Sequence, residues 1–258
     1  MLAKRLIVGL DIKNGRVVKG TKFVNLRDAG DPVELAALYD AEGADEITFL
    51  DITASHERRG LIFDLARRVS EEIFIPFTVG GGISTVDDFA EIMAAGAEKV
   101  FINTAAVKTP DLITRAADRF GAQAVVVAVD AKKVDNPAFA SGYEVYIHGG
   151  RTPTGMDCLE WCHRVEGYGS GEILITSMET DGVQNGFDTG ITRKVADSVG
   201  IPVIISGGAG TPQHLVDGIV EGHAEAVFIA SIVHYRTYSI RECKQAMHDA
   251  GIPVRLRW

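Results

Sequence analysis

The chain has 258 residues, of which 46% are hydrophobic and 24% are charged, and its formal net charge is −9. It contains no apolar run near the roughly 18 residues that a membrane span requires. A nucleic-acid-binding surface needs clustered Lys and Arg, so the net negative charge argues against one. Asp11 ends the first apolar run too early for a secretory segment. These features predict a soluble, cytoplasmic protein that binds neither membranes nor nucleic acids.

Short apolar runs rich in Val and Ile alternate with longer segments of helical period, which is typical of βα units around a parallel sheet. Because consecutive residues are apolar, we expect strands covered on both faces. The eight runs are 6–11, 46–51, 76–80, 99–103, 124–130, 172–177, 202–206 and 226–230. A chain of this length with eight units predicts a single α/β domain over 1–258, a (β/α)8 TIM barrel. An open doubly wound sheet is the alternative, but no Gly-rich dinucleotide turn follows the first run.

Three of the expected helices have start signals. Asp31 and Pro32 precede the first, Ser84 precedes the second, and Thr211 with Pro212 precedes the third. Such residues favour helix caps and first turns, and a glycine follows each of the three segments. The helices should therefore alternate with the strands as the barrel requires.

The two halves of the chain resemble each other. Matching segments are 75–85 with 201–211 and 43–51 with 169–177, both offset by 126 residues, and 97–105 with 224–232, offset by 127. The period is half the chain, which indicates a duplicated half-barrel rather than a short-period solenoid. Chance similarity among barrel strands would explain the shared Val and Ile but not the paired Gly-Gly turns. We expect a twofold half-barrel repeat, about 1–122 and 123–258.

Two sets of strand ends have the composition of anion sites. In these barrels, catalytic groups lie at the carboxyl ends of the strands, and phosphate is commonly bound after strands 7 and 8. Glycines at 80–82 and 207–208 leave backbone amides open to an anion, although glycines also serve as simple turns. Asn103 and Thr104 follow the fourth strand, and Ala230 and Ser231 follow the eighth. Two equivalent sites predict a ligand with a phosphate at each end.

Two aspartates are the candidate reactive groups. Asp11 ends the first strand and Asp130 ends the fifth, and these strands are opposite each other in an eight-stranded barrel. Both carboxylates can therefore reach the middle of the ligand, as general acid/base chemistry requires. The alternative is that each aspartate caps a turn. Asp181 and Gly182 lie beyond the sixth strand, near the second anion site.

Other catalytic classes lack support in the sequence. No Ser-His-Asp order, HExxH motif or P-loop is present. Cys158, Cys162 and Cys243 form no set with zinc-ligand spacing, so we expect unlinked thiols and no metal.

Nine segments resemble the cyclase subunit of imidazole glycerol phosphate synthase, from Met1 to nearly the end of the chain. They are LDIKNGRVVKG (10–20), FLDITAS (49–55), PFTVGGGI (76–83), INTAAV (102–107), QAVVVAVDAK (123–132), HGGRTPTG (148–155), ITSMETDGVQNGFD (175–188), SGGAG (206–210) and VRL (254–256). The resemblance implies a lyase of histidine biosynthesis that needs no cofactor. Ammonia from a glutaminase partner attacks a formimino ribulotide with two phosphates, giving imidazole glycerol phosphate and an aminoimidazole carboxamide ribotide.

The resemblance also implies roles for individual residues. Asp11 and Asp130 correspond to the catalytic pair. One phosphate site corresponds to Gly82, Asn103 and Thr104, and the other to Asp181, Gly182, Gly208, Ala230 and Ser231. Lys19, in an expected flexible loop from about Asn14 to Asp31, corresponds to a lysine that closes over the substrate.

A charged ring is implied at the opposite end of the barrel. Four charged residues stand at or near the amino ends of strands 1, 2, 4 and 6. They are Arg5, Glu46, Lys99 and Glu172. The resemblance implies that they gate ammonia and that this face docks the glutaminase subunit in a heterodimer, with Glu98 beside the contact. The alternative interpretation of these four charges is an ordinary solvated salt-bridge ring.

Two departures and two alternatives stay open. Gly9 stands where the family commonly has Cys, which predicts looser local packing, and Thr152 replaces a lysine, which removes a cation near the fifth strand. Cyclase-like paralogues use ammonia for other amidations. The sister isomerase of the same pathway shares the phosphate sites and both aspartate positions.

Overall fold

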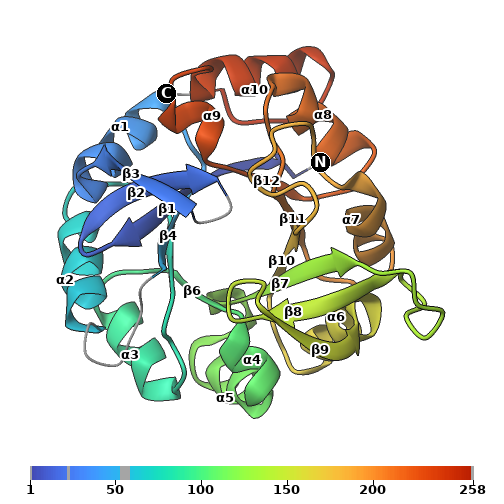
Figure 1. Cartoon of the computed structure of the whole chain (residues 1–258). Coiled ribbons are helices and arrows are strands. Elements are labelled where there is room, and N and C mark those ends of the chain that lie inside the picture. The colour runs from blue at the N-terminus through green and yellow to red at the C-terminus, as the bar shows by residue number, and fades with distance from the viewer. Residues whose placement is uncertain (1, 22–23, 53–58, 257–258) are drawn as a thin grey trace.

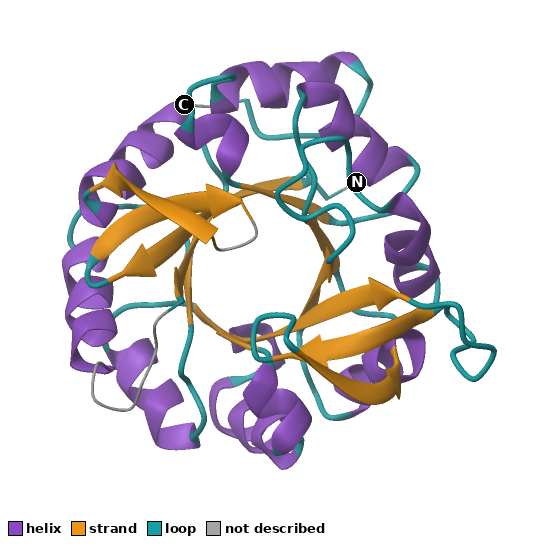
Figure 2. Ribbon diagram, in the orientation of Figure 1, coloured by secondary structure: helices purple, strands orange, loops and turns teal. Residues whose placement is uncertain are grey.

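Eight parallel strands close into a barrel in the computed structural model, which describes residues 2–21, 24–52 and 59–256 (Figures 1 and 2). In order around the barrel they are β1 (Arg5–Lys13), β4 (Glu46–Asp51), β5 (Phe77–Gly80), β6 (Lys99–Ile102), β7 (Val125–Lys133), β10 (Glu172–Ser177), β11 (Val203–Ser206) and β12 (Ala226–Ile229). β12 pairs with β1, and this pairing closes the ring. Each strand overlaps one of the eight predicted runs, which confirms the (β/α)8 barrel.

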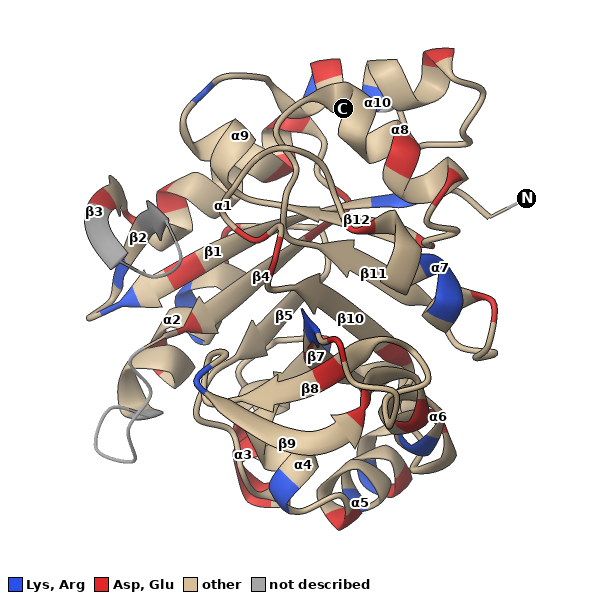
Figure 3. Ribbon diagram, turned by 45° about the vertical axis from the view of Figure 1, so that its right-hand side comes forward, with Lys and Arg blue, Asp and Glu red and all other residues tan. Residues whose placement is uncertain are grey.

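Helices surround the barrel on its outer side, as Figure 2 shows. They are α1 (Pro32–Glu42), α2 (Arg59–Ser70), α3 (Val86–Ala94), α4 (Thr104–Lys108), α5 (Asp111–Phe120), α6 (Cys158–Gly167), α7 (Thr189–Ala196), α8 (Pro212–Val220), α9 (Ser231–His234) and α10 (Ile240–Asp249), with a 3-10 turn, η2 (Ala122–Ala124). Acidic and basic positions are interspersed over these helices (Figure 3). In the described residues, no helix is long and apolar enough to cross a membrane.

The predicted helix starts are correct to within one residue. Asp31 caps α1, because its Oδ1 accepts hydrogen bonds from the amides of Val33 at 2.9 Å and Glu34 at 3.3 Å. The cap of α3 is Thr85 rather than the predicted Ser84. Thr211 precedes α8, but its side chain makes no capping hydrogen bond there, so Pro212 is the main start signal.

Two antiparallel hairpins extend the barrel. β2 (Arg16–Thr21) and β3 (Val24–Gly30) follow β1, and β8 (Tyr143–Ile147) and β9 (Thr152–Asp157) follow β7. The prediction of a loop from Asn14 to Asp31 is therefore wrong over most of that segment. In the view of Figure 1 the two hairpins lie on opposite sides of the barrel opening.

The elements of the first and second halves follow the same order. Each half contains a barrel strand, a hairpin, three helix-strand units, and then a short helix followed by a longer one. This order agrees with the duplication seen in the sequence, while the exact boundary near residue 122 stays a prediction.

Apolar side chains form two regions of core. The larger lies between the strands and the helices. The smaller fills the inside of the barrel and consists of Ile7, Val126, Leu174, Ile204 and Ala226, with Phe101 and Phe228 packed against it. Strand side chains alternate between these two regions because successive residues point to opposite faces. The three cysteines are buried free thiols, as predicted.

Candidate active site

A cavity of about 340 Å³ opens at the carboxyl ends of the barrel strands. The residues that line it come from both halves of the chain. Those predicted from the sequence are Asp11, Asn103, Asp130, Asp181, Gly182, Gly208, Ala230 and Ser231. The barrel thus gathers eight of the expected site residues, far apart in the sequence, around one space.

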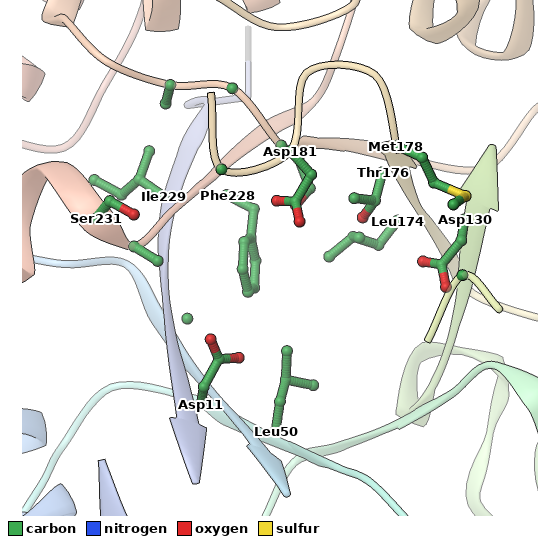
Figure 4. A pocket seen from close by; sticks show the side chains of 18 of the residues that line it. Asp11, Leu50, Asp130, Leu174, Thr176, Met178, Asp181, Phe228, Ile229 and Ser231 are labelled. Atoms are coloured by element: carbon green, nitrogen blue, oxygen red, sulfur yellow. The ribbon is translucent and has the colours of Figure 1, made fainter. Parts of the chain in front are cut away.

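Asp11 and Asp130 point into this cavity from opposite sides (Figure 4). Asp11 lies on β1 and Asp130 on β7, which are separated by β4, β5 and β6 around the barrel. Asp181, from the loop after β10, points toward the same space. The arrangement places a carboxylate on each side of any ligand that spans the cavity.

Asp130 is held in a surrounding that favours its protonated form. Burial raises the pKa of Asp130 to about 6; the negative charge of Asp181 acts in the same direction, and a hydrogen bond from Asn103 opposes both. Asn103 Nδ2 donates this bond to Asp130 Oδ2 at 3.0 Å. A carboxyl group with such a pKa exchanges protons near neutral pH, as acid/base catalysis requires.

The first predicted phosphate site is only partly gathered at the cavity. Asn103 lines it, but its amide binds Asp130, so the structure adds a contact that the sequence did not suggest. Thr104 Oγ1 accepts a hydrogen bond from the His148 amide at 2.9 Å, which attaches α4 to the β8–β9 hairpin. Gly82 is exposed and is not among the residues lining the cavity.

The glycine turns adopt the conformation that only glycine takes easily. The φ angles are 102° at Gly81 and 68° at Gly82, and 82° at Gly207 and 118° at Gly208. These pairs are the same positions of the two half-chain repeats. A Cβ on Gly208 would lie 2.0 Å from the Gly186 carbonyl oxygen, so a side chain is excluded there. Tight turning and open amides thus occur together, and the two interpretations of the glycines are compatible.

The second predicted site lies wholly on the cavity. Gly208 leads from β11, and Ala230 and Ser231 lead from β12 into α9. Ala230 has φ −145° and ψ −73°, close to the φ −127° and ψ −89° of Asn103 at the start of α4. The two strand-to-helix junctions therefore have the same backbone form in both halves.

Thr176 and Leu50 line the cavity and were not predicted, whereas Ser206 begins the predicted glycine turn. Thr176 and Ser206 pair in register on β10 and β11, and Thr176 also pairs with Asp130 on β7, so the three form a polar row. On the opposite side, Asp11 pairs in register with Leu50. The alignment of the two halves could have indicated this difference in polarity, because Thr176 and Leu50 occupy equivalent positions of the repeat. The second half thus supplies the more polar wall.

Gly149 and Gly150, in the turn between β8 and β9, also line the cavity and were missed. They follow His148, and all three residues have positive φ angles of 58° to 76°. Their contribution depends on the hairpin, which brings its turn to the cavity mouth. The segment HGGRTPTG marked this region only by resemblance.

A ring of ion pairs lies at the other end of the barrel. Arg5, Glu46, Lys99 and Glu172 are the first residues of β1, β4, β6 and β10. Glu172 Oε1 lies 3.0 Å from Arg5 Nη1 and 3.1 Å from Lys99 Nζ, and Glu46 Oε1 lies 3.0 Å from Lys99 Nζ and also pairs with Arg5. The glutamate side chains are only 7% and 11% exposed, so the ring is largely buried rather than solvated.

The family model for histidine biosynthesis proteins matches residues 5–239. The chain belongs to this family. It is accordingly an enzyme of histidine biosynthesis, and the family contains both the cyclase and the isomerase types. The match spans all eight barrel strands and all residues of the cavity.

In this histidine biosynthesis protein, the expected effect of Gly9 needs correction. The ring of Phe228 fills the space beside Gly9, where a Cβ would lie 2.2 Å from Phe228 Cζ. The glycine therefore accommodates a larger neighbour and does not loosen the packing. Thr152, the other departure, contacts His148 Nδ1 through its Oγ1 at 3.1 Å and so supports the hairpin turn. Lys19 belongs to β2, and its side chain lies outside the described set.

Proposed function

We propose that this histidine biosynthesis protein is the cyclase subunit of imidazole glycerol phosphate synthase. Its substrate is the formimino ribulotide with two phosphates, and its second reactant is ammonia from a glutaminase subunit. The products are imidazole glycerol phosphate and the aminoimidazole carboxamide ribotide. The proposal rests on the segments that resemble the cyclase and on the two ends of the barrel.

The observation that favours the cyclase over the isomerase is the buried ring of Arg5, Glu46, Lys99 and Glu172. An isomerase acts on its ribotide alone and has no need of a second reactant. An ammonia-using enzyme needs an entrance away from the substrate, and the ring stands at the amino ends of the strands. The apolar interior around Ile7 and Leu174 lies between the ring and the cavity. This barrel interior would be the path of neutral ammonia.

At the cavity, the substrate is held by backbone groups. No Lys or Arg is among the described residues that line it, so one phosphate would be bound by amides of the turn at 207–210 and by the Ser231 hydroxyl, and the other beside Asn103 at the start of α4. Stretched between these two places, the substrate would present its central carbons to both aspartates. Asp130 assists the attack of ammonia by moving a proton, and Asp11 moves protons during cleavage and ring closure. The β2–β3 hairpin that contains Lys19 stands beside the opening and would cover the substrate.

The test is an assay with the formimino ribulotide and an ammonium salt at alkaline pH, where ammonia is unprotonated. We expect consumption of the ribotide and release of both products. Asp11→Asn and Asp130→Asn should each lower turnover by about 100-fold to 10,000-fold, the usual contribution of an acid/base group. Turnover of the unopened aldose isomer instead would identify the isomerase, and turnover of neither ribotide would favour an ammonia-using paralogue.

A further inference from the structure

The loop after β11 is attached to its surroundings by two side chains and one backbone amide that do not line the cavity. Thr180 Oγ1 donates to the Gly207 carbonyl at 2.7 Å, and the Gly186 amide donates to the Gly208 carbonyl at 2.8 Å. The amide of Gly210 donates to His214 Nδ1 at 3.1 Å. The turn at 207–210 is therefore held through two carbonyls and one amide.

The remaining amides of this turn are available to a ligand. Among the described residues, the backbone hydrogen bonds of this turn include none that is donated by the amides of Gly207, Gly208 or Ala209. All three residues line the cavity. An anion at this position would meet several open N–H groups, and their directions are set by the contacts that fix the turn.

The first half of the chain has an equivalent hydrogen bond, in which a different side chain is the acceptor. Asp88 is the third residue of α3, and its Oδ2 accepts from the Ser84 amide at 2.9 Å. His214 is the third residue of α8, and it accepts from Gly210, four residues earlier. Both acceptors are separated from their glycine turns by the same number of residues. Both halves thus have this contact, but the acceptor is a carboxylate in the first half and an imidazole in the second.

From this pair of contacts we infer that His214 is a positioning residue of the second phosphate site. Its Nδ1 fixes the Gly210 amide, and thereby aims the amides of Gly207 and Gly208 at the phosphate of the ligand. The inference rests on the proposed function only for the identity of the two-phosphate ligand. His214 does not itself line the cavity.

The contact with Gly210 uses Nδ1 of His214 as the acceptor, because a backbone N–H donates to a lone pair. The ring edge with Nε2 lies near Gly186, where a Cβ would be 3.8 Å away. The imidazole thus bonds to one of the loops that enclose the second site and lies beside the other.

Two variants separate the effect of the hydrogen bond from the effect of side-chain size. His214→Leu keeps the size of the side chain but removes the acceptor. His214→Asn restores it, because an Asn Oδ1 can occupy the place of His Nδ1. Loss of one neutral hydrogen bond corresponds to roughly a threefold to tenfold change in an equilibrium constant. We expect the leucine variant to bind phosphate at this turn that much more weakly, and the asparagine variant to match the wild type within about twofold.

The probe is inorganic phosphate, titrated into ¹⁵N-labelled whole protein and followed by NMR. The amides of Gly207 and Gly208 report the second site, and those of Gly81 and Gly82 report the first. His214→Leu should weaken binding at the second site alone. Equal weakening at both sites, no weakening, or an asparagine variant that behaves like leucine would overturn the inference.

If His214→Leu does not fold, another variant still tests the inference. Thr180→Val removes the bond to the Gly207 carbonyl at almost unchanged volume and should weaken the same turn selectively; an unchanged affinity would count against the positioning network. The experiment is independent of turnover. If the affinity for phosphate at the second site is the same in the position 214 variants as in the wild type, this inference is wrong and the cyclase proposal is unaffected. If the wild-type protein binds phosphate at neither turn, both the inference and the cyclase proposal are contradicted.

Discussion

At the scale of single residues, the contact between Asn103 and Asp130 should control the pH dependence of the reaction. The Asn103 amide donates to the carboxylate and so lowers the pKa of Asp130 against the effect of burial. Asn103→Ala removes this donor, and the pKa should rise above its present value of about 6. Because a general base must be ionised, the acidic limb of kcat/KM should move to higher pH. The measurement is a pH profile with saturating ammonia.

Asp181→Asn provides the opposite change. The charge of Asp181 raises the pKa of Asp130, so its removal should shift the same limb to lower pH. Opposite shifts in the two variants would assign the limb to Asp130. A limb that stays in place in both variants would show that another group titrates there.

The carboxyl group of Asp130 should lower the free energy of unfolding above neutral pH. Its pKa rises from an ordinary value of 3.8 to about 6 in the folded protein, so the folded state binds the proton more tightly than the unfolded state. The unfolded state loses its proton first as pH rises, and stability therefore falls between these two values. Above the higher one the cost is constant, up to about 3 kcal/mol. Asp130→Asn should be more stable than wild type at pH 8 and similar at pH 4, as measured by urea unfolding. A wild type that is the more stable protein at pH 8 would contradict this.

At the scale of elements, the fit between neighbouring strands depends on glycine. Phe228 on β12 occupies the space beside Gly9 on β1, and Phe101 on β6 lies against Gly80 on β5. Gly9→Ala should force the Phe228 ring from its position and reduce stability by about 1–3 kcal/mol, the usual cost of overpacking. Phe228→Leu in the same chain should restore part of the loss. Denaturant unfolding of the two single variants and the double variant measures this coupling, and additive effects would refute it.

The elements also show what a sequence can and cannot reveal. All eight barrel strands were predictable, because strands buried on both faces have consecutive apolar residues. The hairpins were missed. The segment YEVYI of β8 alternates between buried and partly exposed residues, which is a signal of period two, but TPTGMD of β9 has no such pattern. Gly149 and Gly150 reach the cavity only through that hairpin, so their place in the site was hidden as well.

The contact between Asn103 and Asp130 was hidden for another reason. Asn103 directly follows β6, as predicted, whereas β7 continues past Asp130 to Lys133 rather than ending at that residue. β6 and β7 are neighbours in the barrel. Their adjacency could have been predicted from strand order. The direction of the Asn103 side chain could not, because it depends on the backbone form at the start of α4. Strand order thus predicts which residues share a rim, while side-chain contacts require coordinates.

At the scale of the whole molecule, the barrel has two ends with different chemistry. One end has carboxylates and open amides around the cavity. The other has the ion-paired ring, and apolar side chains fill the interior between them. Such a molecule is suited to receive a neutral reactant at one end and a dianionic one at the other. Under the proposed function, this separation would let a partner subunit deliver ammonia to the ring while the substrate occupies the cavity.

Lys99→Met tests this separation. The lysine contacts both Glu46 and Glu172 in the ring and begins β6, whereas Asn103, which contacts Asp130 at the cavity, follows the other end of that strand. We therefore expect turnover with ammonium salt to stay within about threefold of wild type, because salt-derived ammonia reaches the open cavity directly. Turnover with glutamine and the glutaminase subunit should fall by tenfold or more, as expected for a lost gating contact worth over about 1.4 kcal/mol. Gel filtration with the partner should still show a heterodimer, which separates transfer from docking. Equal losses with both nitrogen sources would mean that the ring supports the fold alone, because removing one member of a buried ion-pair network also destabilises the barrel.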